Sequence, residues 1–170
     1  MKKIILAVIA VMAFSFANAQ DGHFKLGLHA GVPVGSSGDV TSSNTGIDVA
    51  YLWNLGEKFS AGMATGFTNY WGKTYEFQIE GIEGIDTLEG PDLGFIPVAA
   101  SAQYSLAKNF FAGADVGYAI YVGTSGMGAG TGGFYYQPKV GYQNTKWEFY
   151  GAYKGISDVN SVNLGVNYKF

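Results

Sequence analysis

Apolar and polar residues alternate with a period of two through most of this chain. In the stretch SVNLGVNYKF, for example, Val162, Leu164, Val166, Tyr168 and Phe170 are separated by single polar or small residues. A period of two places successive side chains on opposite faces of a β-strand. The chain is therefore expected to consist of strands that each have one apolar face.

Eight segments follow this alternation. A strand that crosses an outer membrane needs about 9–11 residues, apolar toward lipid and polar or small toward the lumen. Eight is an even number, as closure of a single-chain antiparallel barrel normally requires. The predicted fold is an all-β, eight-stranded antiparallel up-and-down transmembrane β-barrel. Its expected strands are residues 23–34, 45–54, 59–67, 95–106, 110–122, 135–143, 146–154 and 161–170.

The connections between these segments differ in length in a regular way. Those after the second, fourth and sixth segments are tight, whereas those after the first, third and fifth are longer. Short periplasmic turns and long extracellular loops are typical of outer-membrane barrels. The connection after the seventh segment, GISDVNS, is only modestly long and fits this rule least well.

A soluble, ligand-holding barrel is the competing interpretation of the same pattern. Its apolar side chains would face inward, and its polar ones would meet water. Glycines such as Gly27, Gly62 and Gly165 lie on the polar face. On a solvent face a glycine weakens its strand, whereas in a narrow lumen it leaves room for larger side chains. The glycines therefore favour a membrane barrel.

The first 20 residues, MKKIILAVIAVMAFSFANAQ, have the order of a secretory signal peptide, with Lys2 and Lys3, an apolar run and a small-residue motif ending at Ala19. The apolar run is shorter than the roughly 20 residues of a spanning helix, so an uncleaved anchor is the weaker alternative. We predict a signal peptide over residues 1–19 and a barrel domain over residues 20–170.

Cleavage would leave eight of the ten lysines against 13 acids, a formal net charge of −5. An acidic chain of this kind is not expected to bind nucleic acid, which favours a basic patch. The absence of cysteine from the sequence excludes disulfides and a lipid-modified cysteine.

Aromatic residues flank each tight turn on the outward parity. Amphipathic rings favour the headgroup region of a membrane, so an interface belt is expected there. A water-soluble barrel has no reason to place rings outward beside its turns. The predicted belt pairs Trp53 with Phe59, Tyr104 with Phe110, and Tyr142 with Trp147.

Charged side chains fall on the inward parity, where an unpaired charge is costly and opposite signs should pair. Counted along the strands, Asp115 and Lys139 reach similar depth, and His29 falls near Asp48. An ion-paired plug is the first interpretation. A thin water path with a gate at Asp115 is the alternative. The expected lumen ion pairs involve Lys25, His29, Asp48, Asp115, Lys139 and Glu148, and the same parity carries Lys154 and Lys169.

The segment from Thr74 to Gly94 carries six acids and no base. A solvated, self-repelling surface loop is the ordinary interpretation. Clustered carboxylates can also hold a divalent cation such as Ca²⁺, although the spacing is not that of an EF-hand. Ile82, Ile85 and Leu88 leave open a contact with the barrel mouth or with an extracellular protein partner. The candidate cation ligands are Glu80, Glu83, Asp86, Glu89 and Asp92.

A catalytic role is not expected. A barrel that hydrolyses lipid would need His, Ser and an acid converging on its lipid-facing side. The two histidines are His23, at the periplasmic end, and His29, on the lumen face, and neither has a serine two or three residues away. No catalytic residue and no cofactor is predicted.

Two long stretches, FIPVAASAQYSLAKNFFAGADVGYAI and GGFYYQPKVGYQNTKWEFYGAYK, together with the terminal Tyr168 and Phe170, are similar to a known family. They resemble the small outer-membrane β-barrel domain proteins of Gram-negative bacteria, often labelled porin-family and akin to OmpA/OmpX-type barrels. The resemblance covers essentially the whole chain after the leader. It implies surrounding outer-membrane lipid and lipopolysaccharide, and it implies that Tyr168 and Phe170 are the signal read by the barrel-assembly machinery.

The function expected from these observations is structural or interaction-based, in a membrane barrel with a packed polar interior that displays extracellular loops. The alternative is a narrow porin or channel for ions or small solutes. Eight strands favour the first, because aqueous porins use about 16–18.

Overall fold

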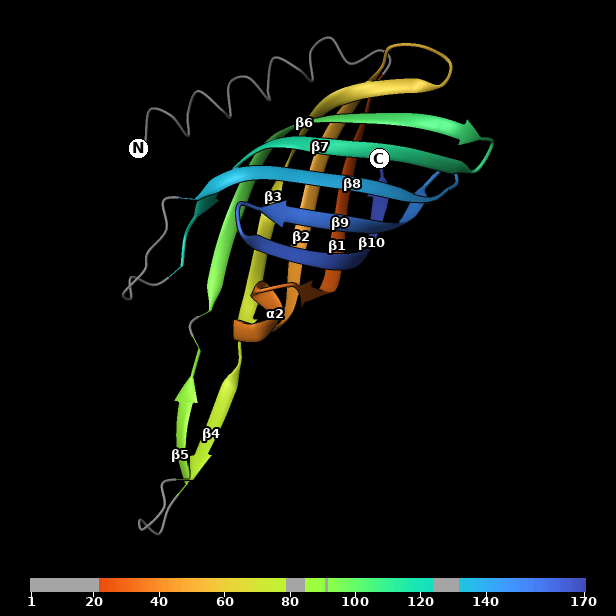
Figure 1. The fold of residues 1–170 in the computed structure, drawn as a ribbon. Helices are drawn as coiled ribbons and strands as arrows, with labels where there is room; N and C mark the ends of the chain where they lie inside the picture. Colours follow the sequence, from red (N-terminus) through yellow and green to blue (C-terminus); the bar gives the residue numbers. More distant parts are fainter. Residues whose placement is uncertain (1–21, 79–84, 91, 124–131) are drawn as a thin grey trace.

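A computed structural model describes residues 22–78, 85–90, 92–123 and 132–170, and most of them form a closed barrel of eight β-strands (Figure 1). The predicted signal peptide, residues 1–19, lies outside the described residues. The barrel strands are β1 (Gly22–Val34), β2 (Thr41–Asn54), β3 (Phe59–Gly72), β6 (Leu93–Ala107), β7 (Phe110–Tyr121), β8 (Gly133–Gln143), β9 (Trp147–Ile156) and β10 (Val159–Lys169).

Around the barrel the strands follow the order β1-β10-β9-β8-β7-β6-β3-β2, and every neighbouring pair is antiparallel. Closure occurs at β1, where Leu28 lies opposite Val166 of β10 on one side and Ile47 of β2 on the other. The predicted all-β, eight-stranded antiparallel barrel is therefore confirmed.

Side-chain exposure alternates along the strands as the sequence pattern predicts. On β10, Leu164 is 73% exposed, whereas the neighbouring Asn163 is 1% exposed. On β1, Leu28 is 60% exposed and Lys25 is 3% exposed. The apolar parity faces outward and the polar parity faces the lumen. A water-soluble barrel would have the reverse arrangement.

The two ends of the barrel differ. The end that carries the start of β1, the end of β10 and the connections 55–58, 108–109 and 144–146 is called here the turn end. The opposite end, called the loop end, carries the connections after β1, β3, β7 and β9. The last of these connections is shorter than expected. β9 and β10 are joined by residues 157–158 alone, with Ser157 in the left-handed region at φ 51°, so this connection is a tight turn.

Two elements at the loop end were not expected. A short helix, α2 (Ser37–Val40), precedes β2, and a separate two-stranded sheet forms from β4 (Thr74–Gln78) and β5 (Ile85–Glu89). Figure 1 shows this hairpin extending away from the barrel. The segment expected to be a solvated surface loop therefore contains a pair of short strands that the sequence reasoning did not identify. The many acids of this segment indicated a loop, so the short runs TYEFQ and IDTLE were not recognised as strands. Their backbones pair from Thr74 with Glu89 to Gln78 with Ile85.

Strands β2 and β3 are also longer than the sequence indicates. β2 starts at Thr41 instead of Thr45, and β3 continues to Gly72 instead of Phe67. The extra residues pair with each other, with a register shift between Thr41 and Ser43. The apolar alternation identifies only the part of each strand that has an apolar outer face. The backbone hydrogen bonds between β2 and β3 continue beyond that part, so both strands are longer than the pattern indicates.

Lumen glycines lie beside large inward side chains. A Cβ on Gly165 would sit 2.3 Å from the ring of Tyr150, and one on Gly46 would sit 2.4 Å from the ring of His29. Because glycine has no side chain, these positions leave the space that the two rings occupy, as expected for a narrow eight-stranded lumen.

Among the described residues, no helix is long and apolar enough to span a membrane.

Candidate functional site

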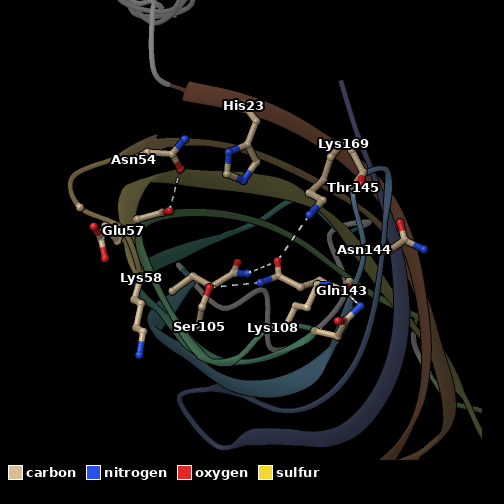
Figure 2. A pocket seen from close by; sticks show the side chains of 14 residues that line it. His23, Asn54, Glu57, Lys58, Ser105, Lys108, Gln143, Asn144, Thr145 and Lys169 are labelled. Carbon is tan, nitrogen blue, oxygen red and sulfur yellow. Dashed lines mark hydrogen bonds between the residues drawn. The ribbon is translucent and has the colours of Figure 1, made fainter.

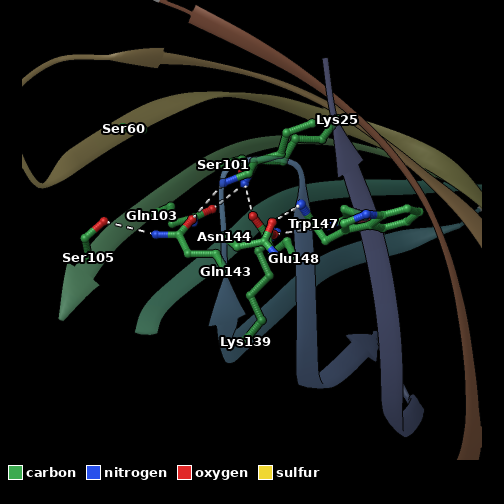
Figure 3. A network of polar contacts seen from close by, with 12 residues as sticks. Lys25, Ser60, Ser101, Gln103, Ser105, Lys139, Gln143, Asn144, Trp147 and Glu148 are labelled. Atoms are coloured by element: carbon green, nitrogen blue, oxygen red, sulfur yellow. Dashed lines mark hydrogen bonds and ion pairs between the residues drawn. The ribbon is translucent and has the colours of Figure 1, made fainter. Parts of the chain in front are cut away.

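The lumen near the turn end holds a buried network centred on Lys25 (Figure 3). Lys25 Nζ donates to Glu148 Oε2 and to Gln103 Oε1, both at 2.5 Å. Asn167 Nδ2 donates to the other Glu148 oxygen at 3.1 Å. Lys25 also lies 5.9 Å from the centre of the Phe111 ring. The structure thus brings together Lys25 of β1 and Glu148 of β9, two of the sequence-predicted lumen charges.

A second pair lies midway along the barrel, between β7 and β8. Lys139 Nζ donates to both carboxylate oxygens of Asp115, at 2.9 and 2.8 Å. Ser101 of β6 donates to the same carboxylate at 2.5 Å. The structure therefore places Asp115 and Lys139 in contact, at the similar depth that the strand count indicates.

The third cluster lies toward the loop end around His29, whose Nδ1 is 2.9 Å from Asp48 Oδ2. Lys154 Nζ donates to His29 Nε2 and to Thr68 Oγ1, each at 2.9 Å. Because an ammonium group can only donate, Nε2 accepts and the ring proton lies on Nδ1, from which it is donated to Asp48. Tyr150 also donates to the Asp48 carboxylate. His29 is therefore a neutral link between an acid and a lysine.

Sequence reasoning did not find the roles of Thr68, Tyr150 and Lys154 in this cluster. All three lie on the inward parity, which was the available signal. The parity indicates which side chains point inward but not their depth, because depth depends on the stagger between β1, β3 and β9.

The lumen charges balance. Among the residues that the structure describes, the barrel interior between its two ends holds three lysines and three acids, a formal net charge of zero with His29 neutral. Burying a charged side chain without a partner costs on the order of several kcal/mol. The arrangement can therefore hold six charges in a narrow interior. They are Lys25, Lys139, Lys154, Asp48, Asp115 and Glu148.

Near the loop end the lumen contents change from charged to aromatic and apolar. Tyr70 and Phe95 meet edge to face with their ring centres 6.0 Å apart. The Tyr70 hydroxyl lies 3.0 Å from Ser161 Oγ, so its polar group has a partner. This cluster lies in the lumen below the loops. Its buried members are Tyr70, Phe95, Ala99, Ala119, Tyr135 and Ile156.

The turn end instead opens into a cavity of about 590 Å³, here called the mouth cavity (Figure 2). Its floor is a chain of amide contacts, in which Gln103 Nε2 donates to Gln143 Oε1 at 3.1 Å and Gln143 Nε2 donates to Ser105 Oγ at 3.2 Å. Below the floor, a cavity of only about 20 Å³ lies among the lumen charges. The mouth cavity lining includes Lys58, Lys108, Lys169, Glu57, His23 and Asn54.

Solved structures of known proteins resemble this architecture, whereas no protein-family model and no curated protein matches the chain. A designed transmembrane β-barrel matches with a TM-score of 0.52 and 10% identity, over 89% of this chain and 98% of that one. The outer-membrane protein Ail of Yersinia pestis, in a phospholipid bilayer nanodisc, matches with a TM-score of 0.52 and 16% identity, over 88% of this chain and 100% of that one. The fold is that of the small eight-stranded outer-membrane barrels.

The aromatic residues flanking the turns of this outer-membrane barrel fold lie on its outer surface. Phe59, Tyr104, Phe110, Tyr142 and Trp147 are exposed there, and Trp53 is half-buried against Tyr51. Phe110 and Tyr142 have ring centres 5.7 Å apart. Their role as an interface belt stays a prediction.

A second group of outward rings lies nearer the loop end and was not identified from the sequence. Phe134 stacks on Tyr136 at 6.0 Å, and Tyr136 stacks on Tyr153 of the neighbouring strand at 6.1 Å. Trp71, next to the last residue of β3 at the loop end, is also exposed. These residues continue the outward parity of their strands, which was the signal available, but they do not flank a tight turn.

The last residues of the chain lie at the turn end, where β10 closes the barrel against β1. Trp147 contacts Tyr168 at 5.0 Å, Tyr168 contacts Phe170 at 4.8 Å, and Phe170 contacts Phe24 at 5.6 Å, all between ring centres. The backbone N–H of Phe170 donates to the Phe24 carbonyl at 2.9 Å. Tyr168 and Phe170 are thus part of the closing seam, and their role as an assembly signal stays a prediction.

The candidate cation ligands are only partly described. Glu80 and Glu83 lie outside the described residues, and Asp86 and Glu89 lie on β5. Asp92 Oδ1 accepts a hydrogen bond from the Gly72 N–H at 2.9 Å. Within the described ranges, no group of three or more His, Asp or Glu side chains is placed to hold a metal ion.

Side-chain contacts connect the loops to one another at the loop end. Ser37 Oγ of α2 donates to the Asp158 carbonyl at 3.0 Å and accepts from the Asn160 N–H at 2.8 Å. Lys73, at the base of the β4–β5 hairpin, donates its side chain to the Gly38 carbonyl and its backbone N–H to Val40. The β1–β2 connection therefore lies between the hairpin base and the β9–β10 turn.

Proposed function

We propose that this protein is an integral outer-membrane barrel with a packed polar interior, and that its role is structural or interaction-based rather than enzymatic. The observation that carries the proposal is the inversion of the barrel, with exposed Leu28 and Leu164 outside and buried Lys25, Lys154 and Glu148 inside. A continuous apolar outer band is the arrangement that a surrounding lipid requires.

The proposed location is the outer membrane of a Gram-negative cell, reached by export through the signal peptide at residues 1–19. The turn end would face the periplasm and the loop end would face outward, in contact with outer-membrane lipid and lipopolysaccharide. Tyr168 and Phe170, in the closing seam, would be read by the barrel-assembly machinery.

The interior supports a closed barrel rather than a channel. Three layers of paired charges follow one another along the lumen, and the Tyr70–Phe95 cluster lies above them. An eight-stranded interior is just wide enough for side chains to fill. The mouth cavity favours the alternative of a narrow channel, because ions could enter the barrel through it from the turn end. In that alternative, Asp115 would act as the gate.

The loop end supports an interaction role. The β4–β5 hairpin extends from the barrel (Figure 1). The described loop-end residues carry far more acids than bases. A partner with a basic surface would match this charge. The acids are Asp39, Glu76, Asp86, Glu89, Asp92 and Asp158, against the single base Lys73. Through the segment from Thr74 to Gly94 the hairpin would meet an extracellular protein.

The test is conductance of refolded residues 20–170 in planar bilayers, compared with Asp115→Ala. We expect no unit conductance from the native sequence, because the lumen is filled. Discrete conductance steps from the native barrel would contradict the closed interior and favour the channel. If steps occur only with Asp115→Ala, while gel mobility shows a folded barrel, the ion pair acts as a plug that can open.

A further inference from the structure

The mouth cavity has an unbalanced charge that the rest of the barrel interior lacks. Three lysines, Lys58, Lys108 and Lys169, line it against one acid, Glu57. None of these lysines takes part in the ion pairs found among the described residues. Lys169 reaches across the mouth to Gln143 at 3.4 Å (Figure 2), a weak contact. The cavity is therefore a polar space lined by three lysines and one acid, with a formal excess of positive charge.

We infer that the mouth cavity binds a small peptide-like ligand that carries a free carboxylate and approaches from the turn end. Ammonium groups donate charge-assisted hydrogen bonds to a carboxylate, which are roughly twice as strong as neutral ones. The three lysines come from separate elements, two from different turns and one from β10, so they surround the opening instead of forming a single patch.

The walls favour a peptide over a bare anion. Besides the lysines, the cavity is lined by amide side chains, which offer both donors and acceptors to a peptide group. Those of Gln103 and Gln143 are already held by one another and by Ser105, so they form a fixed floor. The amide side chains are Asn54, Gln103, Asn109, Gln143 and Asn144.

The depth and size of the cavity set the kind of ligand. A volume of about 590 Å³ lies within the range of small-ligand sites, roughly 300–1,000 Å³. The floor rests on Gln103, which also accepts from Lys25 in the buried network (Figure 3). The cavity is therefore blind, so it suits the binding of a chain end rather than passage through the barrel.

The test is a titration of isotope-labelled residues 20–170, refolded in an uncharged maltoside detergent because a phosphate headgroup would compete. The probes are acetyl-Ala-Ala-Ala with a free carboxylate, the same peptide with an amidated terminus, and inorganic phosphate. We expect shifts of the Gln103, Ser105 and Gln143 amide signals, with the amidated peptide about tenfold weaker for loss of one charged hydrogen bond.

Lys146 provides a matched control, because it lies on a turn at the same end but does not line the cavity. We expect Lys169→Gln and Lys108→Gln each to weaken the free-carboxylate peptide severalfold, and Lys146→Gln to leave its affinity unchanged. Lys58→Gln, on an exposed turn, serves as a further variant if Lys169→Gln does not fold.

Three results would overturn the inference. They are an absence of shifts with the free-carboxylate peptide, phosphate binding as tight as the peptide, or equal weakening by Lys146→Gln, which would indicate general attraction to a basic face. Binding in detergent depends neither on membrane orientation nor on conductance. Its failure would therefore leave the proposed function standing.

Discussion

The lysines inside the barrel and those at its mouth are in opposite situations. Lys25, Lys139 and Lys154 are removed from water, and each donates to an acid or to a residue held by one. Lys58 and Lys108 lie at the mouth, exposed, and outside the ion pairs of the described residues. Removal from water makes a partner obligatory, whereas partial hydration does not. The comparison teaches that a lysine deep in the lumen stabilises the barrel through its partner, whereas a lysine at the mouth is available to bind a ligand.

The largest effect is expected from breaking a lumen pair. Glu148→Ala leaves Lys25 buried without its acidic partner and still hydrogen-bonded to Gln103, and the free energy of unfolding should fall by about 3–5 kcal/mol. Urea unfolding of the refolded barrel in lipid vesicles measures this change. Glu57→Ala, at the mouth, is the control and should change stability by less than about 0.5 kcal/mol, as exposed substitutions usually do. Equal effects from both would remove the distinction between the two regions.

A smaller effect is expected from adding one methyl group to the lumen. Gly165→Ala would place a Cβ 2.3 Å from the Tyr150 ring, and the displaced ring should cost about 1–3 kcal/mol. Gly56→Ala, on a mouth turn, has no atom within 4 Å of the new Cβ and provides the same change without the clash. Thermal unfolding followed by gel mobility compares the two. An unaffected Gly165→Ala variant would mean that the lumen is looser than its contacts indicate.

The smallest net effect is expected from replacing a whole lumen pair by apolar groups. Lys25→Met with Glu148→Leu removes both charges, so neither is left unpaired, and stability should stay within about 1–2 kcal/mol of the native barrel. The same urea experiment, with each single variant alongside, gives the coupling between the two residues. A double variant as unstable as the sum of its singles would show that Lys25 and Glu148 act independently.

The barrel could be predicted because its pattern is local. Each strand carries its own alternation, so the inward parity of Lys25, Asp115 and Glu148 can be read one strand at a time. The contact between Lys139 and Asp115 also follows from simple counting, because β7 and β8 are consecutive and joined at one end.

The remaining contacts depend on strands that are distant in sequence. Lys154 meets His29 from 125 residues away, across a register that no local pattern encodes. The mouth cavity combines Lys58, Lys108 and Lys169 from three separate stretches of chain. The β4–β5 hairpin was missed for another reason. The acids of this segment indicated a solvated loop, and each of its two strands is only five residues long.

The measurement that tests the central claim most directly is the accessibility of spin labels on the outer face. The sequence contains no cysteine, so single cysteines can be introduced at Met63, Val98, Val116 and Leu164 and labelled without background. In lipid vesicles the account predicts strong relaxation of all four labels by oxygen dissolved in the acyl chains and little by a water-soluble nickel complex. A label at Gly56, on a turn, should show the reverse. Preferential relaxation of the four labels by the nickel complex would contradict the assignment of this face to lipid.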